Sequence, residues 1–123
     1  MSARILIVED EPSILFSVSR LLRRRGFSIL EALDGSVAMK LIWDERNTID
    51  VILLDMTIPG KSSHEVFVEA QRLRPNLKII LTSVYSEDVA SSSPSWLFVH
   101  GYIRKPYQID LLEQLVEQVL RSN

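Results

Sequence analysis

Cysteine is absent from this chain of 123 residues, so neither a disulfide framework nor a thiolate metal site can form. An excess of one charge sign is also absent: the formal net charge is −2, which gives no reason to expect nucleic acid as a partner. No apolar run approaches the ~20 residues of a membrane helix, and the first residues do not form a signal peptide. These absences predict a cytoplasmic domain that makes no membrane contact of its own.

The composition is that of an ordinary globular protein, with 46% hydrophobic and 24% charged residues. The length suffices for one hydrophobic core but not for two. The chain contains no internal repeat, and its serine-rich stretch at residues 91–95 is too short to be a linker. We therefore expect a single domain over residues 1–123.

Apolar runs alternate with amphipathic segments along the chain. Strands are predicted at residues 4–8, 27–31, 51–54, 77–81 and 101–104, and each is followed by a segment with helical spacing. The helix after the fourth strand, starting near residues 86–88, is expected to be short because serines and Pro94 follow. This alternation predicts a parallel sheet with helices on both faces.

Local signals indicate where several helices begin. Pro12 suits the first position of the first helix, and Asp34 or Ser36 can cap the second. Ser62 and Glu65 have the spacing of a capping box before the third. The last helix is predicted at residues 110–120. Its expected inward residues are Leu111, Leu112, Leu115, Val116 and Val119.

Polar side chains stand at the ends of four predicted strands. Glu9 and Asp10 follow the first strand, Asp55 the third, Thr82 the fourth and Lys105 the fifth. The carboxyl ends of parallel strands share one edge of a sheet, so these residues can converge. Each alone has a plainer interpretation as a turn or strand-end residue, and their coincidence favours a functional site.

Three carboxylates at one edge repel one another by roughly 1–4 kcal/mol per close pair. Mg²⁺ relieves this repulsion, since it takes oxygen ligands and pairs with phosphoryl groups. Lys105 adds a cation for phosphate oxygens and Thr82 a hydroxyl donor. A carboxylate can itself be the nucleophile that forms an acyl phosphate. We interpret Asp55 as a phosphorylated aspartate beside a Mg²⁺ site.

The segments that carry these residues resemble the receiver domain of two-component response regulators, across essentially the whole chain. The matching segments are ILIVEDEP at 5–12, LDMTIPG at 54–60, LTS at 81–83 and YIRKP at 102–106. The resemblance implies an α/β fold of the flavodoxin-like (βα)5 type, a doubly wound parallel sheet with strand order 2-1-3-4-5. It also implies a signalling domain that catalyses only its own phosphorylation and dephosphorylation.

The resemblance implies a role for each site residue. Asp55 would accept a phosphoryl group from the phosphohistidine of a histidine kinase or histidine phosphotransfer domain. Mg²⁺ would be held by Asp10, Asp55 and the Thr57 main-chain carbonyl, with Glu9 acting through water.

Thr82 and Lys105 would contact the phosphoryl oxygens, by the same resemblance. Tyr102 matches the aromatic switch position, whose ring turns inward as the threonine moves toward the phosphate. Its plainer interpretation is an aromatic residue packed on an edge strand.

A finer match is to the C-terminal receiver of hybrid sensor histidine kinases, through PGKSSHEVF at 59–67, LTSVYS at 81–86 and GYIRKPY at 101–107. A free-standing regulator remains the alternative. A homodimer through the face formed by the fourth helix, the fifth strand and the last helix is also left open.

Some residues depart from the family pattern. Glu9 stands where aspartate is common, and Ser63 replaces a common glycine, so we expect an altered turn there. In this family, the residues two places after the aspartate and two after the threonine control dephosphorylation. They are Thr57 and Val84 here, and neither can position attacking water as an amide or acid would. This predicts a phosphoryl state that lasts hours.

Other functions of this fold class would need residues that this chain lacks. A phosphohydrolase of the haloacid-dehalogenase type would need a second aspartate at Thr57. A flavin site would need a phosphate loop in place of residues 9–12. A receiver that no longer accepts phosphate is disfavoured by the complete residue set. His64 and His100 are each lone histidines and are interpreted as surface residues.

Overall fold

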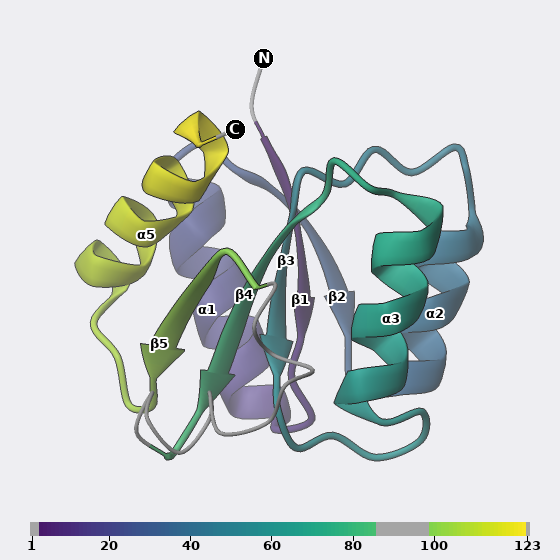
Figure 1. The fold of residues 1–123 in the computed structure, drawn as a ribbon. Coiled ribbons are helices and arrows are strands. Elements are labelled where there is room, and N and C mark those ends of the chain that lie inside the picture. Colours follow the sequence, from purple (N-terminus) through teal and green to yellow (C-terminus); the bar gives the residue numbers. More distant parts are fainter. Residues whose placement is uncertain (1–2, 86–98, 123) are drawn as a thin grey trace.

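A computed structural model describes residues 3–85 and 99–122. Five strands form a parallel sheet in the order β2-β1-β3-β4-β5, which confirms the flavodoxin-like topology (Figure 1). The strands are Arg4–Val8 (β1), Ser28–Ala32 (β2), Val51–Asp55 (β3), Lys78–Ser83 (β4) and Gly101–Arg104 (β5). The helices are Pro12–Arg24 (α1), Gly35–Trp43 (α2), Ser63–Leu73 (α3) and Ile109–Arg121 (α5). The helix expected near residues 86–88 lies outside the described residues.

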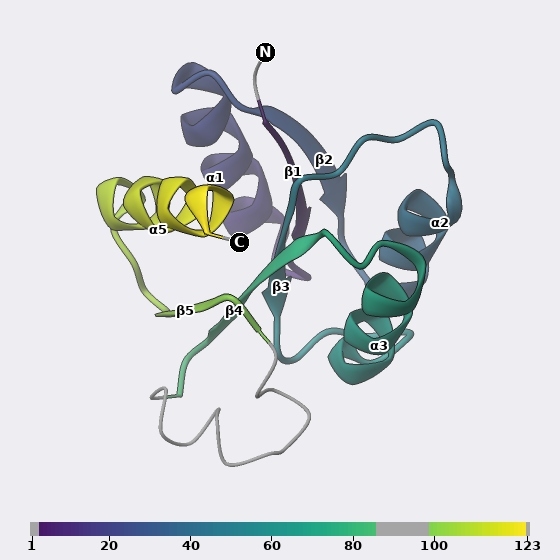
Figure 2. The same ribbon diagram turned by 45° about the horizontal axis from the view of Figure 1, so that its top comes forward.

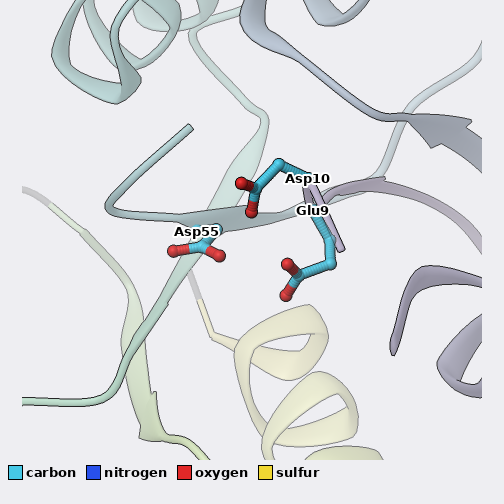
Figure 3. Close-up of side chains that lie close together, drawn as sticks. All are labelled: Glu9, Asp10 and Asp55. Atoms are coloured by element: carbon cyan, nitrogen blue, oxygen red, sulfur yellow. The ribbon is translucent and has the colours of Figure 1, made fainter. Parts of the chain in front are cut away.

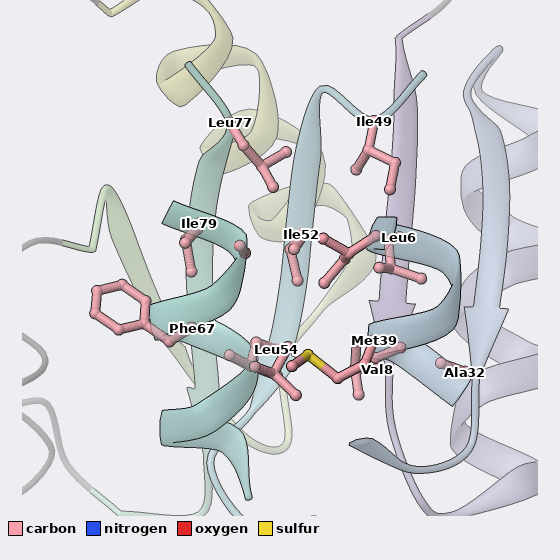
Figure 4. Packing of buried hydrophobic residues seen from close by; sticks show 14 of the residues in the cluster. Leu6, Val8, Ala32, Met39, Ile49, Ile52, Leu54, Phe67, Leu77 and Ile79 are labelled. Carbon is pink, nitrogen blue, oxygen red and sulfur yellow. The ribbon is translucent and has the colours of Figure 1, made fainter. Parts of the chain in front are cut away.

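Helices cover both faces of the sheet: α1 and α5 pack on one face, and α2 and α3 on the other (Figures 1 and 2). Alternate strand residues point to opposite faces, so the central strands supply both cores. Leu6, Ile52 and Leu54 join the core on the side of α2 and α3 (Figure 4). Ile5, Val51 and Leu53 join the opposite core. All five residues of β3 are buried, as a continuous apolar run predicts.

The capping signals in the sequence are confirmed. The Ser62 hydroxyl accepts a hydrogen bond from the Glu65 amide at 3.1 Å, and the Glu65 carboxylate accepts one from the Ser62 amide at 3.3 Å. Of the two caps proposed for α2, Asp34 is the one used: its carboxylate accepts from the Val37 amide at 2.8 Å. These caps determine where α2 and α3 begin beside the carboxyl edge of the sheet.

The inward face of α5 is narrower than the sequence suggested. Leu112, Val116 and Val119 are buried, but Leu111 is 54% exposed. Successive helical residues point about 100° apart, and the rotation of α5 about its own axis turns Leu112 toward the sheet and Leu111 toward solvent. The prediction that Leu111 points inward is wrong.

Arg74, the residue after α3, holds the loop between α2 and β3 in place through side-chain hydrogen bonds. Its guanidinium donates hydrogen bonds to the main-chain oxygens of Ile42, Asp44 and Asn47, at distances from 2.7 to 3.1 Å. One side chain thereby satisfies a carbonyl in the last turn of α2 and two in the loop that follows it.

Within residues 3–85 and 99–122, no helix combines the length and apolarity needed to span a bilayer.

Candidate functional site

The sheet register brings the predicted site residues to one edge. Asp55, the last residue of β3, pairs with Thr82 of β4. Val8, the last residue of β1, pairs with Leu54, so Glu9 and Asp10 continue the chain beside Asp55. Figure 3 shows the three carboxylates gathered at the ends of β1 and β3. Parallel pairing therefore brings together residues that the sequence separates widely.

The acidic cluster combines buried and exposed oxygens. Glu9 and Asp55 are 3% and 5% exposed, whereas Asp10 is open to solvent. One carboxylate oxygen from each residue lies within 4.8 Å of the others. Oxygen ligands so spaced, with an open side for water, suit a hard divalent cation such as Mg²⁺.

Lys105 lies between the two buried acids. Its Nζ is 2.6 Å from Asp55 Oδ2, and it also forms an ion pair with Glu9. Burial raises the pKa of Glu9 against the opposing effect of the lysine hydrogen bond. Burial alone would lower the pKa of Lys105, but its hydrogen bonds to Asp55 and Glu9 outweigh that effect and raise it. The ammonium thus neutralises carboxylates that would otherwise be buried without a counter-charge.

Thr82 contributes a buried hydroxyl directly across the sheet from Asp55. The residue is 2% exposed, and among the described residues its Oγ1 has no hydrogen-bond partner. An unpaired buried hydroxyl costs about 1–3 kcal/mol, and such groups often belong to functional sites. A donor without an acceptor beside a carboxylate fits a site that receives additional oxygen atoms.

Short hydrogen-bonded links organise the loop after Asp55. The Thr57 amide donates to Asp55 Oδ1 at 3.0 Å, and the Met56 amide donates to the Thr82 carbonyl at 2.9 Å. The buried Ser63 hydroxyl donates to the main-chain carbonyl of Asp55. Ser63 is the first residue of α3, so serine in place of glycine leaves the helix start intact and ties it to the end of β3.

Tyr102 is partly buried on β5, with its hydroxyl directed at the end of β4. That hydroxyl is 3.1 Å from Ser83 Oγ and donates to the Tyr85 carbonyl, while Ser83 Oγ accepts from the Tyr85 amide at 2.9 Å. Its ring packs against the core beneath α2 and α3. The predicted switch residue is therefore hydrogen-bonded to the segment that follows Thr82.

Three features escaped the sequence analysis. The Ser63 bond is one, and the second is Tyr107, whose pKa is raised by burial and by the charges of Glu9 and Asp55. The third is His100, whose Nδ1 accepts from the Ile79 amide at 3.0 Å. His100 is exposed, as predicted, yet it also completes the pairing of β4 with the chain before β5. Strand periodicity cannot reveal these three features, because each depends on where two distant segments meet.

An open, mostly apolar groove borders the site between α1 and the segment after β5. Its lining includes Lys105 and Val84, which is 60% exposed. The remaining principal lining residues are Ile14, Val18, Leu21, Pro106 and Tyr107. The exposed face of α1 thus lies close to the acidic cluster.

Residues 5–117 match the family of the response regulator receiver domain. This chain belongs to that family, and it is a receiver domain of two-component signalling with an acidic cluster at the expected edge.

Individual relatives agree with this assignment. The chain is 27% identical over 121 residues to the sensor kinase CckA of Brucella abortus, an alignment that covers 98% of this chain and 13% of the kinase. The receiver domain of the hybrid histidine kinase CckA superposes with a TM-score of 0.81 at 30% identity, covering 97% of this chain and all of that one. The response regulator TrrA of Thermotoga maritima, solved with Mg²⁺ and BeF, gives a TM-score of 0.83 at 32% identity, over 95% and 98% of the two chains.

Proposed function

We propose that this receiver domain accepts a phosphoryl group on Asp55 from a phosphohistidine, in a reaction that requires Mg²⁺. The observation that carries the proposal is the surroundings of Asp55. Its carboxylate is buried between a second acid and Lys105, and an unpaired hydroxyl stands on the neighbouring strand. A structural turn would require none of these three neighbours.

In the proposed reaction an Asp55 carboxylate oxygen attacks phosphorus. The phosphorus–nitrogen bond of the phosphohistidine breaks, its electron pair stays on the imidazole, and an acyl phosphate remains on Asp55. Lys105 and Thr82 then bind the added phosphoryl oxygens, which gives the Thr82 hydroxyl its acceptor. Lys105 already lies at hydrogen-bond distance from the nucleophile.

The cation site proposed here consists of Asp10, Asp55 and the Thr57 carbonyl, with Glu9 acting through water. Mg²⁺ would neutralise the charge that collects as the phosphoryl group approaches. The oxygen donors on three carboxylates and the open side at Asp10 support this choice.

The proposed partner is a histidine kinase or a histidine phosphotransfer domain in the cytoplasm. It would dock on α1, where the groove beside Lys105 exposes apolar surface. We assign this domain no contact with nucleic acid or membrane. Residues 1–123 would act as one receiver unit, either within a hybrid kinase or as a free-standing regulator. The similar structures include a receiver domain from a hybrid histidine kinase and a response regulator.

The output would depend on Thr82 and Tyr102. Once Thr82 binds a phosphoryl oxygen, β4 and the residues after it would shift. The Tyr102 hydroxyl is bonded to those residues through Ser83 and Tyr85, so its ring would respond. The altered face around β5 would then be what a partner, or a second copy of the domain, recognises.

Phosphorylation can be tested with acetyl phosphate, MgCl₂ and intact-protein mass spectrometry. The wild-type protein should gain one phosphoryl group and Asp55→Asn should gain none. Asp34→Asn is the matched control: it changes another aspartate at a turn and retains the helix cap, since asparagine caps as well as aspartate. Equal labelling of the wild type and Asp55→Asn would refute the assignment.

A further inference from the structure

The loop between β3 and α3, residues 56–62, lies against the first turn of α2. The Gly35 amide donates a hydrogen bond to the Pro59 carbonyl at 3.0 Å. A Cβ atom built on Gly35 would stand 1.9 Å from the Lys61 carbonyl oxygen and 2.7 Å from its carbonyl carbon. These two nearest atoms belong to main chain, which cannot rotate aside as a side chain can, and Lys61 Cβ follows at 2.9 Å. The two segments therefore approach more closely than any residue other than glycine allows.

Space, and not backbone conformation, is what requires glycine at this position. Among the described residues, only Gly26 and Gly60 have positive φ angles, 96° and 78°. Gly35 is the first residue of α2, and its backbone conformation is open to any L-residue. Alanine at position 35 would therefore suit the helix and would collide only with the loop.

The middle of this loop is supported by the Ile58 side chain, which packs against the core on the side of α2 and α3, and by the contact with α2. Its start is held by the Thr57 and Met56 amides, and its end by the Ser63 hydroxyl and the capping box. Between these anchors, the α2 contact is strengthened by a second close approach. A Cβ on Gly60 would lie 3.1 Å from Ser36 Oγ. The turn at residues 59–61 is thus braced from α2, and Thr57 lies on the same short loop.

We propose that Gly35 is a positioning residue for the cation site: it lets α2 brace the loop and so holds the Thr57 main-chain carbonyl in place. This inference rests on the proposed function, in which that carbonyl is a ligand. Mg²⁺ demands near-ideal octahedral geometry, so a ligand displaced by about 1 Å is largely lost. A methyl group at position 35 must move the Lys61 carbonyl by about that distance.

The experiment compares Mg²⁺ binding by three glycine variants and the wild type, followed through amide NMR shifts during a MgCl₂ titration. Gly35→Ala should weaken Mg²⁺ affinity by about tenfold or more, as loss of an outer support typically does. Gly26→Ala is the control: its positive φ makes alanine unfavourable, but no atom lies within 4 Å of the added Cβ. It should lose stability and keep the wild-type affinity.

Gly60→Ala keeps the test decisive if Gly35→Ala does not fold. It carries the same kind of positive-φ strain as Gly26→Ala, but it presses on Ser36 at the brace. Its Mg²⁺ affinity should fall below that of Gly26→Ala. Wild-type affinity in every variant that folds would overturn the positioning role and leave the proposed function standing. A wild-type protein that neither binds Mg²⁺ nor accepts phosphate would instead refute the proposed function.

Discussion

The Lys105 ammonium lies 2.6 Å from an Asp55 carboxylate oxygen in a site where both side chains are largely buried, at 15% and 7% exposure. It also pairs with Glu9, so one cation offsets two buried acids. Lys105 therefore has a structural role, the neutralisation of two buried acids, as well as the proposed contact with phosphate. These two roles can be separated by experiment.

Lys105→Met should lower the free energy of unfolding by about 3–5 kcal/mol without divalent metal, because it leaves two buried carboxylates uncompensated. MgCl₂ should recover part of this loss, since a cation bound by the same acids replaces the missing charge. Urea unfolding in EDTA and in MgCl₂ measures both effects. Lys40→Met, at an exposed site on α2, should change stability by less than about 0.5 kcal/mol. A Lys105→Met midpoint that MgCl₂ does not move would contradict this account.

Ser63 and Ser19 offer a matched pair of buried hydroxyls. Ser63 donates to the Asp55 carbonyl, whereas Ser19 Oγ has no partner among the described residues. Ser63→Ala should cost about 1–2 kcal/mol of unfolding free energy. Ser19→Ala should stabilise by about 0.5–1 kcal/mol, since it removes an unpaired polar atom and improves helix propensity. Thermal and urea unfolding of the two variants provide the comparison, and changes of the same sign would count against it.

Arg74 and Arg72 are near neighbours with different expected effects. Arg74→Lys should cost about 2 kcal/mol, because an ammonium cannot reproduce the fork that binds three carbonyls. Arg72→Lys alters only a surface ion pair with Glu69 and should cost less than about 1 kcal/mol. Urea denaturation at neutral pH measures both. Equal losses would show that the guanidinium hydrogen bonds add little.

His100 should make stability depend on pH. Partial desolvation of the His100 ring, and secondly the charge of Lys78, lower its pKa in the folded state below the ordinary value of 6.5. The unfolded chain then takes up a proton first, so stability is complete above pH 6.5 and falls as pH drops from there toward the folded pKa. Protonation of Nδ1 would also remove the acceptor of the Ile79 amide.

The test of this pH effect is the unfolding of His100→Asn, which retains an acceptor but cannot titrate, from about pH 7.5 to about pH 5.5, roughly one unit either side of the ordinary histidine pKa. This variant should lose part of the wild-type slope. Gln114→Asn, at an exposed position on α5 that does not titrate, should keep that slope. An unchanged slope in His100→Asn would exclude this histidine as the source.

Thr57 and Val84 are predicted to determine how long the phosphoryl group remains on Asp55. Both are exposed beside the site, and neither carries an amide or acid to orient water. We expect a lifetime of hours, shortened by about tenfold or more in Val84→Glu, which adds a group able to position water. Mass spectrometry of the labelled protein in MgCl₂ at successive times measures the decay. A wild-type lifetime of seconds would refute the prediction.

Much of the fold could be predicted because its determinants are local or periodic. The buried run of β3, the Ser62 and Glu65 cap and the alternation of strands and helices are all visible along the chain. The convergence of Glu9, Asp55 and Lys105 followed from one rule about parallel sheets. Local pattern could not decide which of Leu111 and Leu112 faces the sheet, because that depends on how α5 is rotated against its neighbours.

Contacts between segments far apart in the chain could not be predicted from the sequence either, because they depend on how the elements pack together. The Lys61 main chain leaves no room for a side chain at position 35. The guanidinium of Arg74 is bound by main-chain carbonyls that the fold brings to it, beginning with that of Ile42 in α2. Ser63 stands where glycine is common, which signalled a disturbed turn. The structure instead gives its hydroxyl an acceptor that only the folded loop can present.

The order of the strands along the chain also has a consequence for folding during synthesis. The acids come from the ends of β1 and β3, but their compensating lysine follows β5, which pairs at the edge of the sheet. A nascent chain that ends at β4 would contain Asp55 and Glu9 without the lysine that neutralises them, so repulsion between the two acids would oppose closure of that edge. The charge balance of this edge would then be complete only when the last strand has docked. On the proposed function, a kinase would therefore find a complete acceptor site only on fully folded copies.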